Sequence, residues 1–303
     1  MTSLRFAVAL IVGIAVAYAG SDGPGTFAVV ESVADAANPN AVDYQLSRVG
    51  GGEGEREVLV HSPRPIELLS CDEGRILYAE ETGRLLEMDQ QSKVVRVVGE
   101  LPEPLSEESK GHYVRVARSG SVLVAANTDA GDLRVEGTFR LYEVTREGRA
   151  KVLLAGHKRV SAMRMVAHDE AELILPDRVL RFNLDAGTYE TTGVIPRELV
   201  GDLVYVRNGL SVHGSDAGKT ITIRRDLHGP VVVAYRARGH FAGFADLDGS
   251  RESMLVIDVG IEEGDGRLVS KGDRLMEVQA STERSTEVYR SNGNMFSACF
   301  ERR

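Results

Sequence analysis

Short apolar runs, broken by Gly, Asp, Asn or Glu-Gly, recur along the chain from Thr26 to the C-terminus. In several runs apolar and polar positions alternate, as in residues 114–116 (Val-Arg-Val) and 221–223 (Ile-Thr-Ile). A period of two is typical of half-buried β-strands. Beyond residue 25 there is no 3.6-residue apolar stripe over three turns. The pattern therefore predicts an all-β barrel, sandwich or propeller.

A repeated strand decides between these architectures. Arg84–Met88 (RLLEM), Arg140–Val144 (RLYEV) and Arg274–Val278 (RLMEV) share one pattern, each followed by a polar turn and another strand. Looser versions of the same strand are Val42–Leu46, Leu180–Leu184 and Thr220–Arg224. The central positions of the six segments are 42, 56, 40, 41 and 53 residues apart. Such spacing is typical of four-stranded propeller blades.

The N-terminal and C-terminal segments together supply the strands of one blade. Met295–Phe300 is an apolar run with no later partner, whereas Thr26–Glu31, Ala41–Ser47 and Arg56–Val60 resemble the second, third and fourth strands of a blade without its first strand. Joining them produces a sixth blade and removes two open sheet edges. The sequence thus predicts a six-bladed β-propeller, closed by three N-terminal strands and one C-terminal strand, as a single domain over residues 26–303. Five or seven blades remain alternatives.

A family resemblance supports this interpretation. Leu154–His157 resembles the Gly-His opening of a WD repeat, and Gly111-His112 and Gly239-His240 repeat the dipeptide before other first strands. The chain has no Trp, so the structural tetrad of WD repeats is absent. With six units and an export signal, the chain resembles TolB-like six-bladed propellers. The resemblance implies architecture only.

The N-terminus predicts export. Arg5 precedes an apolar run from Phe6 to Ala19 that ends in small residues, which is the pattern of a signal peptide over residues 1–19. The run is shorter than the about 20 residues of a membrane-spanning helix, and an uncleaved anchor is the alternative. Residues 20–25 form a short tether. Cleavage removes Arg5, so the net charge falls from −9 to −10, and an acidic secreted or periplasmic protein makes nucleic acid an unfavourable partner.

Two cysteines, Cys71 and Cys299, fall at the same point of two first strands in adjacent blades. In an oxidising compartment they are candidates for one disulfide across the ring closure. Two buried thiols are the alternative, because Cα atoms more than about 7 Å apart cannot be bridged.

Asp246 and Asp248 form the sharpest candidate metal site. The segment Phe244–Glu252 contains Asp-x-Asp-Gly, which resembles the calcium loop of FG-GAP propeller repeats. Ser250 and Met254 stand where that loop has further acids, and calcium prefers about six to eight oxygen ligands. The alternative is a hairpin turn between the first two strands of the fifth blade.

Arg115 and Arg164 lie on expected first strands, which line the central channel of a propeller. They are candidate ligands for an anion in the channel. The alternative is that each pairs with a nearby acid, as buried charges normally do.

Other motifs point to no enzyme. Gly214–Thr220 is one residue short of a phosphate-binding loop and lies between strands, so it predicts a hairpin turn. The seven histidines show no zinc-binding spacing, and no Gly-x-Ser-x-Gly is present. The longest connections, Pro102–Gly111, Thr128–Thr138 and Glu262–Lys271, are expected to carry specificity.

We therefore expect an exported, non-enzymatic module that binds a protein or small ligand or acts as a scaffold. The alternatives are a calcium-dependent hydrolase or lactonase-like propeller with its site in the channel, and a purely structural protein. No cofactor other than calcium is indicated.

Overall fold

The computed structural model describes most of the chain. The described residues are 25–34, 42–50, 55–72, 74–102, 111–115, 121–127, 137–195, 203–207, 209–215, 218–226, 229–238, 241–248, 252–264, 267–270, 272–280 and 284–301. The proposed signal peptide and most of the tether lie outside them.

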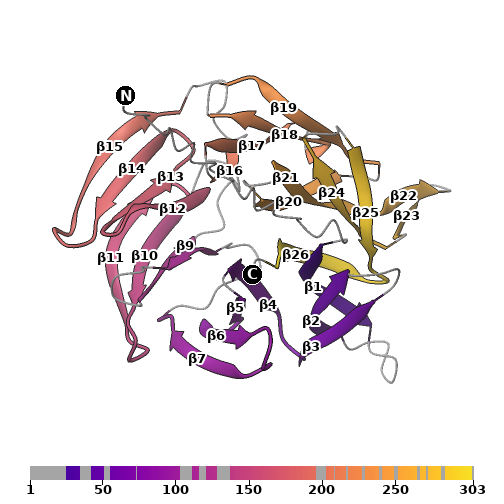
Figure 1. Ribbon diagram of the computed structural model, residues 1–303, viewed down its shortest axis with the longest axis horizontal. Coiled ribbons are helices and arrows are strands. Elements are labelled where there is room, and N and C mark those ends of the chain that lie inside the picture. The colour runs from indigo at the N-terminus through magenta and orange to yellow at the C-terminus, as the bar shows by residue number, and fades with distance from the viewer. Residues whose placement is uncertain are drawn as a thin grey trace, which may run out of the picture.

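Six four-stranded antiparallel sheets stand around a common axis like the blades of a propeller (Figure 1). From the innermost strand outward, blade 1 is β4 (Ile66–Asp72), β5 (Arg75–Glu80), β6 (Arg84–Asp89) and β7 (Val95–Glu100). Blade 2 is β8 (Gly111–Arg115), β9 (Val122–Asn127), β10 (Thr138–Val144) and β11 (Ala150–His157). Blade 3 is β12 (Ala162–Ala167), β13 (Glu170–Ile174), β14 (Arg178–Asn183) and β15 (Thr188–Val194). Blade 4 is β16 (Leu203–Arg207), β17 (Leu210–Ser215), β18 (Thr220–Arg225) and β19 (Val231–Arg236).

The last two blades differ in how the chain builds them. Blade 5 is β20 (Phe241–Asp248), β21 (Ser253–Val259), β24 (Arg274–Gln279) and β25 (Arg284–Arg290), with the hairpin β22 (Ile261–Gly264) and β23 (Arg267–Ser270) inserted before β24. Blade 6 is β26 (Asn294–Phe300), β1 (Thr26–Ala34), β2 (Val42–Gly50) and β3 (Arg56–Ser62). The six-bladed prediction is confirmed.

The predicted closure is also confirmed. The C-terminal strand β26 pairs antiparallel with β1, placing Phe27 opposite Phe300 and Ala28 opposite Cys299. The rings of Phe27 and Phe300 lie 5.8 Å apart between their centroids. The innermost strand of blade 6 therefore comes from one end of the chain and the other three strands from the other end.

Apolar side chains pack between neighbouring blades rather than inside one sheet. The described residues form five apolar clusters, which join blades 1 and 2, 2 and 3, 4 and 5, 5 and 6, and 6 and 1. The largest fully buried side chains, among them Tyr142, Phe139 and Phe182, belong to these clusters. The ring therefore depends on contacts between blades for its hydrophobic stabilisation.

Every outermost strand breaks register with its neighbour. A bulge or irregularity separates the third and fourth strands at Leu46/Ser47, Leu85/Leu86, Leu141/Tyr142, Val179/Leu180, Ile223/Arg224 and Leu275/Met276. Because an extra residue increases the local twist, each blade curls at its rim.

Two segments differ in detail from a plain connection. The expected loop Glu262–Lys271 contains the two-stranded β22–β23 ribbon, which lies at the right of Figure 1. Gly218, before β18, lies at φ 85°, a conformation that glycine adopts without strain. The segment that resembles a phosphate loop therefore joins β17 to β18, as its hairpin interpretation predicted.

Candidate functional site

Arg164 lies on the innermost strand of blade 3 and is held by an acid of its own blade. Its Nε donates to Glu172 at 2.8 Å, and Arg181 donates to the other carboxylate oxygen at 2.9 Å. The three residues stand directly opposite one another on β12, β13 and β14. The side chain of Arg115 lies outside the described part of β8. Arg164 thus takes part in a structural ion-pair network within its blade.

Glu172 is the buried centre of this network, with 4% of its surface exposed. Burial raises the pKa of Glu172, but hydrogen bonds from Arg181 and Arg164 outweigh it and hold the pKa below its usual value. Blade 1 contains a related triad one strand further out, since Arg75 of β5 and Arg96 of β7 both bind the buried Glu87 of β6. Neither triad was recognisable without the pairing register.

Asp246 fastens the closing strand to blade 5. Its carboxylate accepts hydrogen bonds from the backbone N–H of Leu247 at 2.8 Å and of Phe300 at 3.0 Å. Asp248 is the half-buried last residue of β20, opposite Ser253. In the part of the chain that the structure describes, no group of three His, Cys, Asp or Glu side chains is arranged to hold a metal ion. β20 and β21 pair as the first two strands of blade 5, and residues 249–251 between them lie outside the described residues.

Two more buried acids hold blade 6 against blade 5. Asp273 accepts the backbone N–H groups of Met295 and Gly260, at 2.8 and 3.2 Å, while burial raises its pKa above the usual value. Glu31 binds Arg56 at 2.7 Å and accepts a hydrogen bond from the Tyr289 hydroxyl at 3.1 Å. Burial, followed by the charge of Glu31, raises the pKa of Tyr289 to about 12. Asp273 and Glu31 therefore link blades 5 and 6 where the ring closes.

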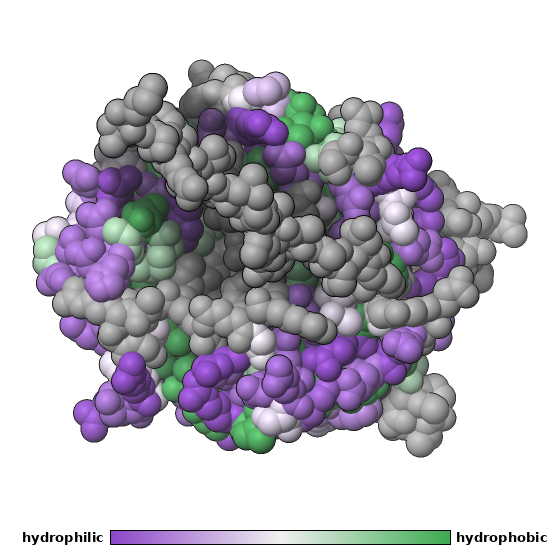
Figure 2. Space-filling model, viewed as in Figure 1, coloured by the Kyte–Doolittle hydropathy of each residue, from purple (hydrophilic) through white to green (hydrophobic). Residues whose placement is uncertain are grey.

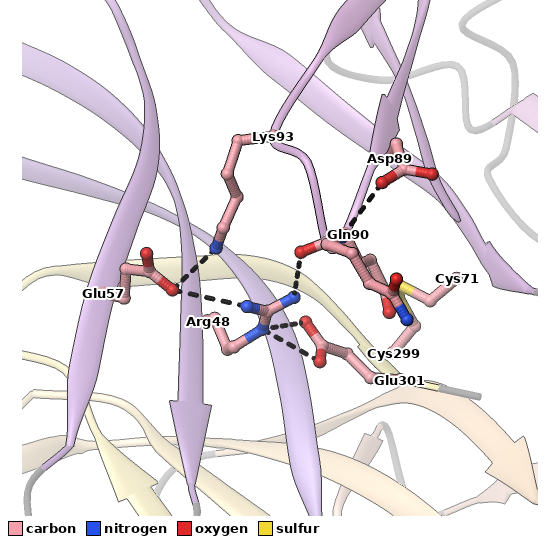
Figure 3. Close-up of polar contacts among 9 residues, drawn as sticks. Arg48, Glu57, Cys71, Asp89, Gln90, Lys93, Cys299 and Glu301 are labelled. Carbon is pink, nitrogen blue, oxygen red and sulfur yellow. Dashed lines mark hydrogen bonds and ion pairs between the residues drawn. A yellow bond between two sulfur atoms is a disulfide. The ribbon is translucent and has the colours of Figure 1, made fainter. Parts of the chain in front are cut away.

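A disulfide joins blade 6 to blade 1. Cys71 of β4 and Cys299 of β26 are both buried, their Cα atoms are 6.0 Å apart, and the structure bonds their sulfur atoms (Figure 3). This Cα separation lies within the normal range for a disulfide.

A cluster of charged residues also links blade 6 to blade 1. Arg48 donates from Nε to Glu301 at 2.7 and 2.9 Å and from its terminal nitrogen to the Gln90 carbonyl at 3.2 Å. Glu57 contacts Arg48 at 3.3 Å and Lys93 at 2.8 Å (Figure 3). The cluster therefore ties the outer strands of blade 6 to the β6–β7 turn of blade 1.

The exposed apolar side chains of the rim are dispersed. Val95 and Val97 on β7, Val152 on β11 and Tyr189 on β15 are more than 40% exposed. In the view of Figure 2 the rim is mostly hydrophilic, interrupted by small hydrophobic patches. Dispersed apolar residues are normal on protein surfaces and do not by themselves define a binding site.

The long connections gather on one face of the ring. In an antiparallel blade, the connections from second to third strand and from fourth strand to the next blade leave from the same end. The connections from β1 to β2, β7 to β8, β9 to β10, β15 to β16 and β21 to β24 belong to this face, and each exceeds six residues. All connections on the opposite face have six residues or fewer. We call the first the connection face.

Comparison with solved structures agrees with the architecture. A chain of the nidogen–laminin complex aligns with a TM-score of 0.56 at 6% identity, covering 90% of this chain and 97% of that chain. A protein of unknown function from Bacteroides caccae aligns with a TM-score of 0.53 at 12% identity, covering 91% and 98%. At such identities the likeness shows the fold alone.

Sequence comparisons add no family. No protein-family model matches the chain, and no curated protein matches it. The chain is a six-bladed β-propeller, and its likeness to TolB-like and WD-repeat propellers stays a resemblance of architecture. Among the described residues, no helix has the length and apolar character needed to cross a membrane.

Proposed function

We propose that the protein is an exported, non-enzymatic binding module that presents its connection face to a protein partner or small ligand. In this proposal the signal peptide 1–19 is removed, and the tether 20–25 leads into one propeller domain over residues 26–303. The compartment is extracellular or periplasmic, where the Cys71–Cys299 disulfide is stable.

The asymmetry between the two faces carries this proposal. Five connections of more than six residues leave the connection face, and the β22–β23 ribbon is built into one of them. Long connections on a rigid scaffold are the usual carriers of specificity. The ring beneath them is held by the disulfide and by Asp246, Asp273 and Glu31. A rigid base of this kind lowers the ordering cost of binding.

Replacing residues 262–270 with a short Gly-Asn-Gly link tests the binding role. The blade 5 strands β21 and β24 still pair without this ribbon, so we expect the melting temperature to change by less than about 3 °C, within the range of a surface change. Immobilised wild-type protein should retain a specific partner or ligand from the exported fraction of its source cells, and the shortened variant should lose it. Equal retention by both proteins contradicts a role for this connection.

The calcium-dependent enzyme makes a different prediction. A bound cation stabilises the folded state by mass action, so removing calcium with a chelator would lower the melting temperature. Under the binding-module proposal the melting curve stays unchanged in excess chelator. A fall that calcium reverses and magnesium does not would favour the enzyme.

A further inference from the structure

The β22–β23 ribbon belongs to none of the six blades. Within the described part of the chain, its two strands pair only with each other, from Ile261 opposite Ser270 to Gly264 opposite Arg267. In Figure 1 the ribbon projects beyond β25, away from the centre of the ring. An isolated two-stranded ribbon is marginally stable in water, whereas a third strand supplies the pairing that a stable sheet needs. The ribbon is therefore an element to which a further strand can be added.

The ring holds both ends of the ribbon. Gly260, directly before β22, donates its N–H to the buried carboxylate of Asp273 at 3.2 Å, and the same carboxylate accepts the N–H of Met295 at 2.8 Å. A Cβ atom at Gly260 would lie 2.0 Å from the carbonyl oxygen of Gly272. The backbones at the two ends of the ribbon are thus in direct contact, which only glycine at position 260 permits.

A second buried acid fixes the strand that leads into the ribbon. Asp258, near the end of β21, accepts the backbone N–H of Arg238 at 2.9 Å and contacts Arg274 at 3.3 Å. Its side chain is fully buried. Asp258 thereby links the start of the ribbon to the β19–β20 connection. Because this base is ordered before any partner arrives, binding to the ribbon carries a lower entropic cost.

The register of the ribbon determines which of its backbone groups are available. Gly264 pairs with Arg267 and two residues separate them, so this pair exchanges both of its hydrogen bonds within the ribbon. Bonded and non-bonded pairs alternate along an antiparallel ladder. On β22 the residues of the non-bonded pairs are Ile261 and Glu263. Their N–H and C=O groups therefore point away from β23, along an edge that pairs with no other described strand.

The residues of this edge are acidic. Glu262 and Glu263 are consecutive on β22, in a chain of net charge −9. Opposite charges on neighbouring strands are favourable and like charges are unfavourable. A second copy that added its own β22 would bring acid against acid. An extended segment with lysine or arginine finds complementary charge there, and the negative field of the whole protein attracts it.

We propose that the outer edge of β22 receives an extended, basic segment of a partner protein as the third strand of the ribbon. This inference rests on the proposed function, because it names the chemistry of the partner at the connection face. The backbone of the segment pairs with Ile261 and Glu263, and its basic side chains lie beside Glu262 and Glu263. In this mode of recognition the backbone bonds supply affinity and the side chains supply specificity.

Selection from displayed random ten-residue peptides tests the proposal. The mature, oxidised protein is the bait, and peptides that also bind the variant with residues 262–270 replaced are discarded. We expect the remaining peptides to alternate lysine or arginine with valine, isoleucine or threonine and to lack proline at their centre, since these preferences are those of a basic strand. Failure to enrich any ribbon-dependent peptide, or enrichment of acidic or proline-rich ones, overturns the proposal.

Methylation of single backbone nitrogens tests the edge pairing itself. In a strand added to an edge, only every second N–H faces the neighbouring strand. In a synthetic copy of the most enriched peptide, methylation at alternate nitrogens should therefore weaken binding at least ~10-fold, and methylation at the nitrogens between them should have little effect. An even, small effect at every position contradicts strand addition. This scan uses the unaltered protein, so it decides even where a variant fails to fold.

Charge variants locate the site. Glu262→Gln combined with Glu263→Gln should weaken binding of the same peptide by about 5-fold, since two cross-strand charge pairs are lost. The control is Glu100→Gln combined with Glu190→Gln, which removes the same charge from exposed positions of β7 and β15. Equal weakening in the two double variants would mean that the peptide responds to the overall charge of the protein, which contradicts the assignment to β22.

Two further results separate this inference from its alternatives. A dimer at micromolar concentration that disappears on replacing residues 262–270, measured by sedimentation, would make a second copy the occupant and overturn the proposal. A natural partner retained through the ribbon, together with peptides that show no basic preference, would support the binding module and contradict the basic segment. Edge-binding basic peptides without any retained natural partner would support the β22 site and contradict the partner expected in the source cells.

Discussion

At the scale of single residues, His213 determines how part of the stability depends on pH. Burial, followed by the charge of Arg224, lowers its pKa to about 4 in the folded protein, against about 6.5 in an unfolded chain. As the pH falls below 6.5, the unfolded state takes up a proton that the folded state refuses. The free energy of unfolding contributed by His213 is therefore complete above about pH 6.5 and is lost progressively toward pH 4.

Urea unfolding between pH 7.5 and 4.5 checks this dependence. The wild type should lose stability over this range more steeply than His213→Gln, which has no titrating ring at that position. His157→Gln, at an exposed position of β11, is the control and should follow the wild type. Parallel curves for all three proteins would show that His213 does not titrate with the lowered pKa.

Asp246 makes a second prediction at this scale. In Asp246→Asn one carboxylate oxygen becomes an NH₂ group, which cannot accept from Leu247 or Phe300. We expect a loss of about 1–3 kcal/mol in the free energy of unfolding, the cost of an unsatisfied buried donor. Chemical denaturation measures it, and Glu81→Gln in the exposed β5–β6 turn is the control, expected within about 0.5 kcal/mol of the wild type. A loss no larger than that of the control would mean that Asp246 does not hold the closing strand.

The sequence located Asp246 but did not reveal its structural role. Asp246 stood out because Asp-x-Asp-Gly is a calcium-loop pattern, but its bond to Phe300 spans 54 positions and depends on ring closure. His213 and Ser211 were overlooked. Their signal was present, since β17 and β18 alternate apolar and polar residues, whereas the second strands β9 and β21 are buried almost throughout.

At the scale of elements, β26 has the largest consequence for the fold. It supplies the innermost strand of blade 6 and contacts blade 5 through Met295 and Phe300. Ending the chain after Gly293 removes this strand and exposes the apolar edge of β1. We expect loss of the cooperative melting transition and of the monomeric elution peak, because the ring can no longer close.

A chain that ends after Glu301 is the control for that truncation. It keeps β26 and the bond from Glu301 to Arg48, so it should melt as the full chain does. A protein truncated after Gly293 that melts normally would contradict the closure.

Most elements were predictable because a blade is a local unit. Hairpins with short turns bring neighbouring strands together, and the apolar runs predicted their positions within a few residues. The β22–β23 ribbon was not predicted, because its acidic and glycine-containing sequence lacks an apolar run long enough to indicate strands. The bulges could not be predicted either, because they depend on how strands pair rather than on local sequence.

At the scale of the whole molecule, the disulfide sets the stability of the closed ring. Cys71 and Cys299 are separated by 228 positions, so their bond restrains most of the unfolded chain. The chain-entropy model assigns about 4–5 kcal/mol to such a crosslink. Cys71→Ser with Cys299→Ser should therefore lower the melting temperature on the order of 10 °C.

Alkylation and mass spectrometry check the bond directly. The unreduced, denatured wild type should gain no alkyl groups, and the reduced protein should gain two. Two modifications without reductant would show that the thiols are free. In that case the double Ser variant should differ from the wild type only by the cost of replacing two buried side chains.

The register breaks at the rim bear on aggregation at high protein concentration. A six-bladed ring presents six outward-facing strand edges, and each is a template on which another molecule can lengthen the sheet. In this protein each of those outermost strands has a bulge or irregularity in its pairing with the third strand of its blade. A straight ladder of hydrogen bonds between two copies is therefore unavailable, and a crowded solution of this protein should stay free of fibrils even though valine is exposed along β7.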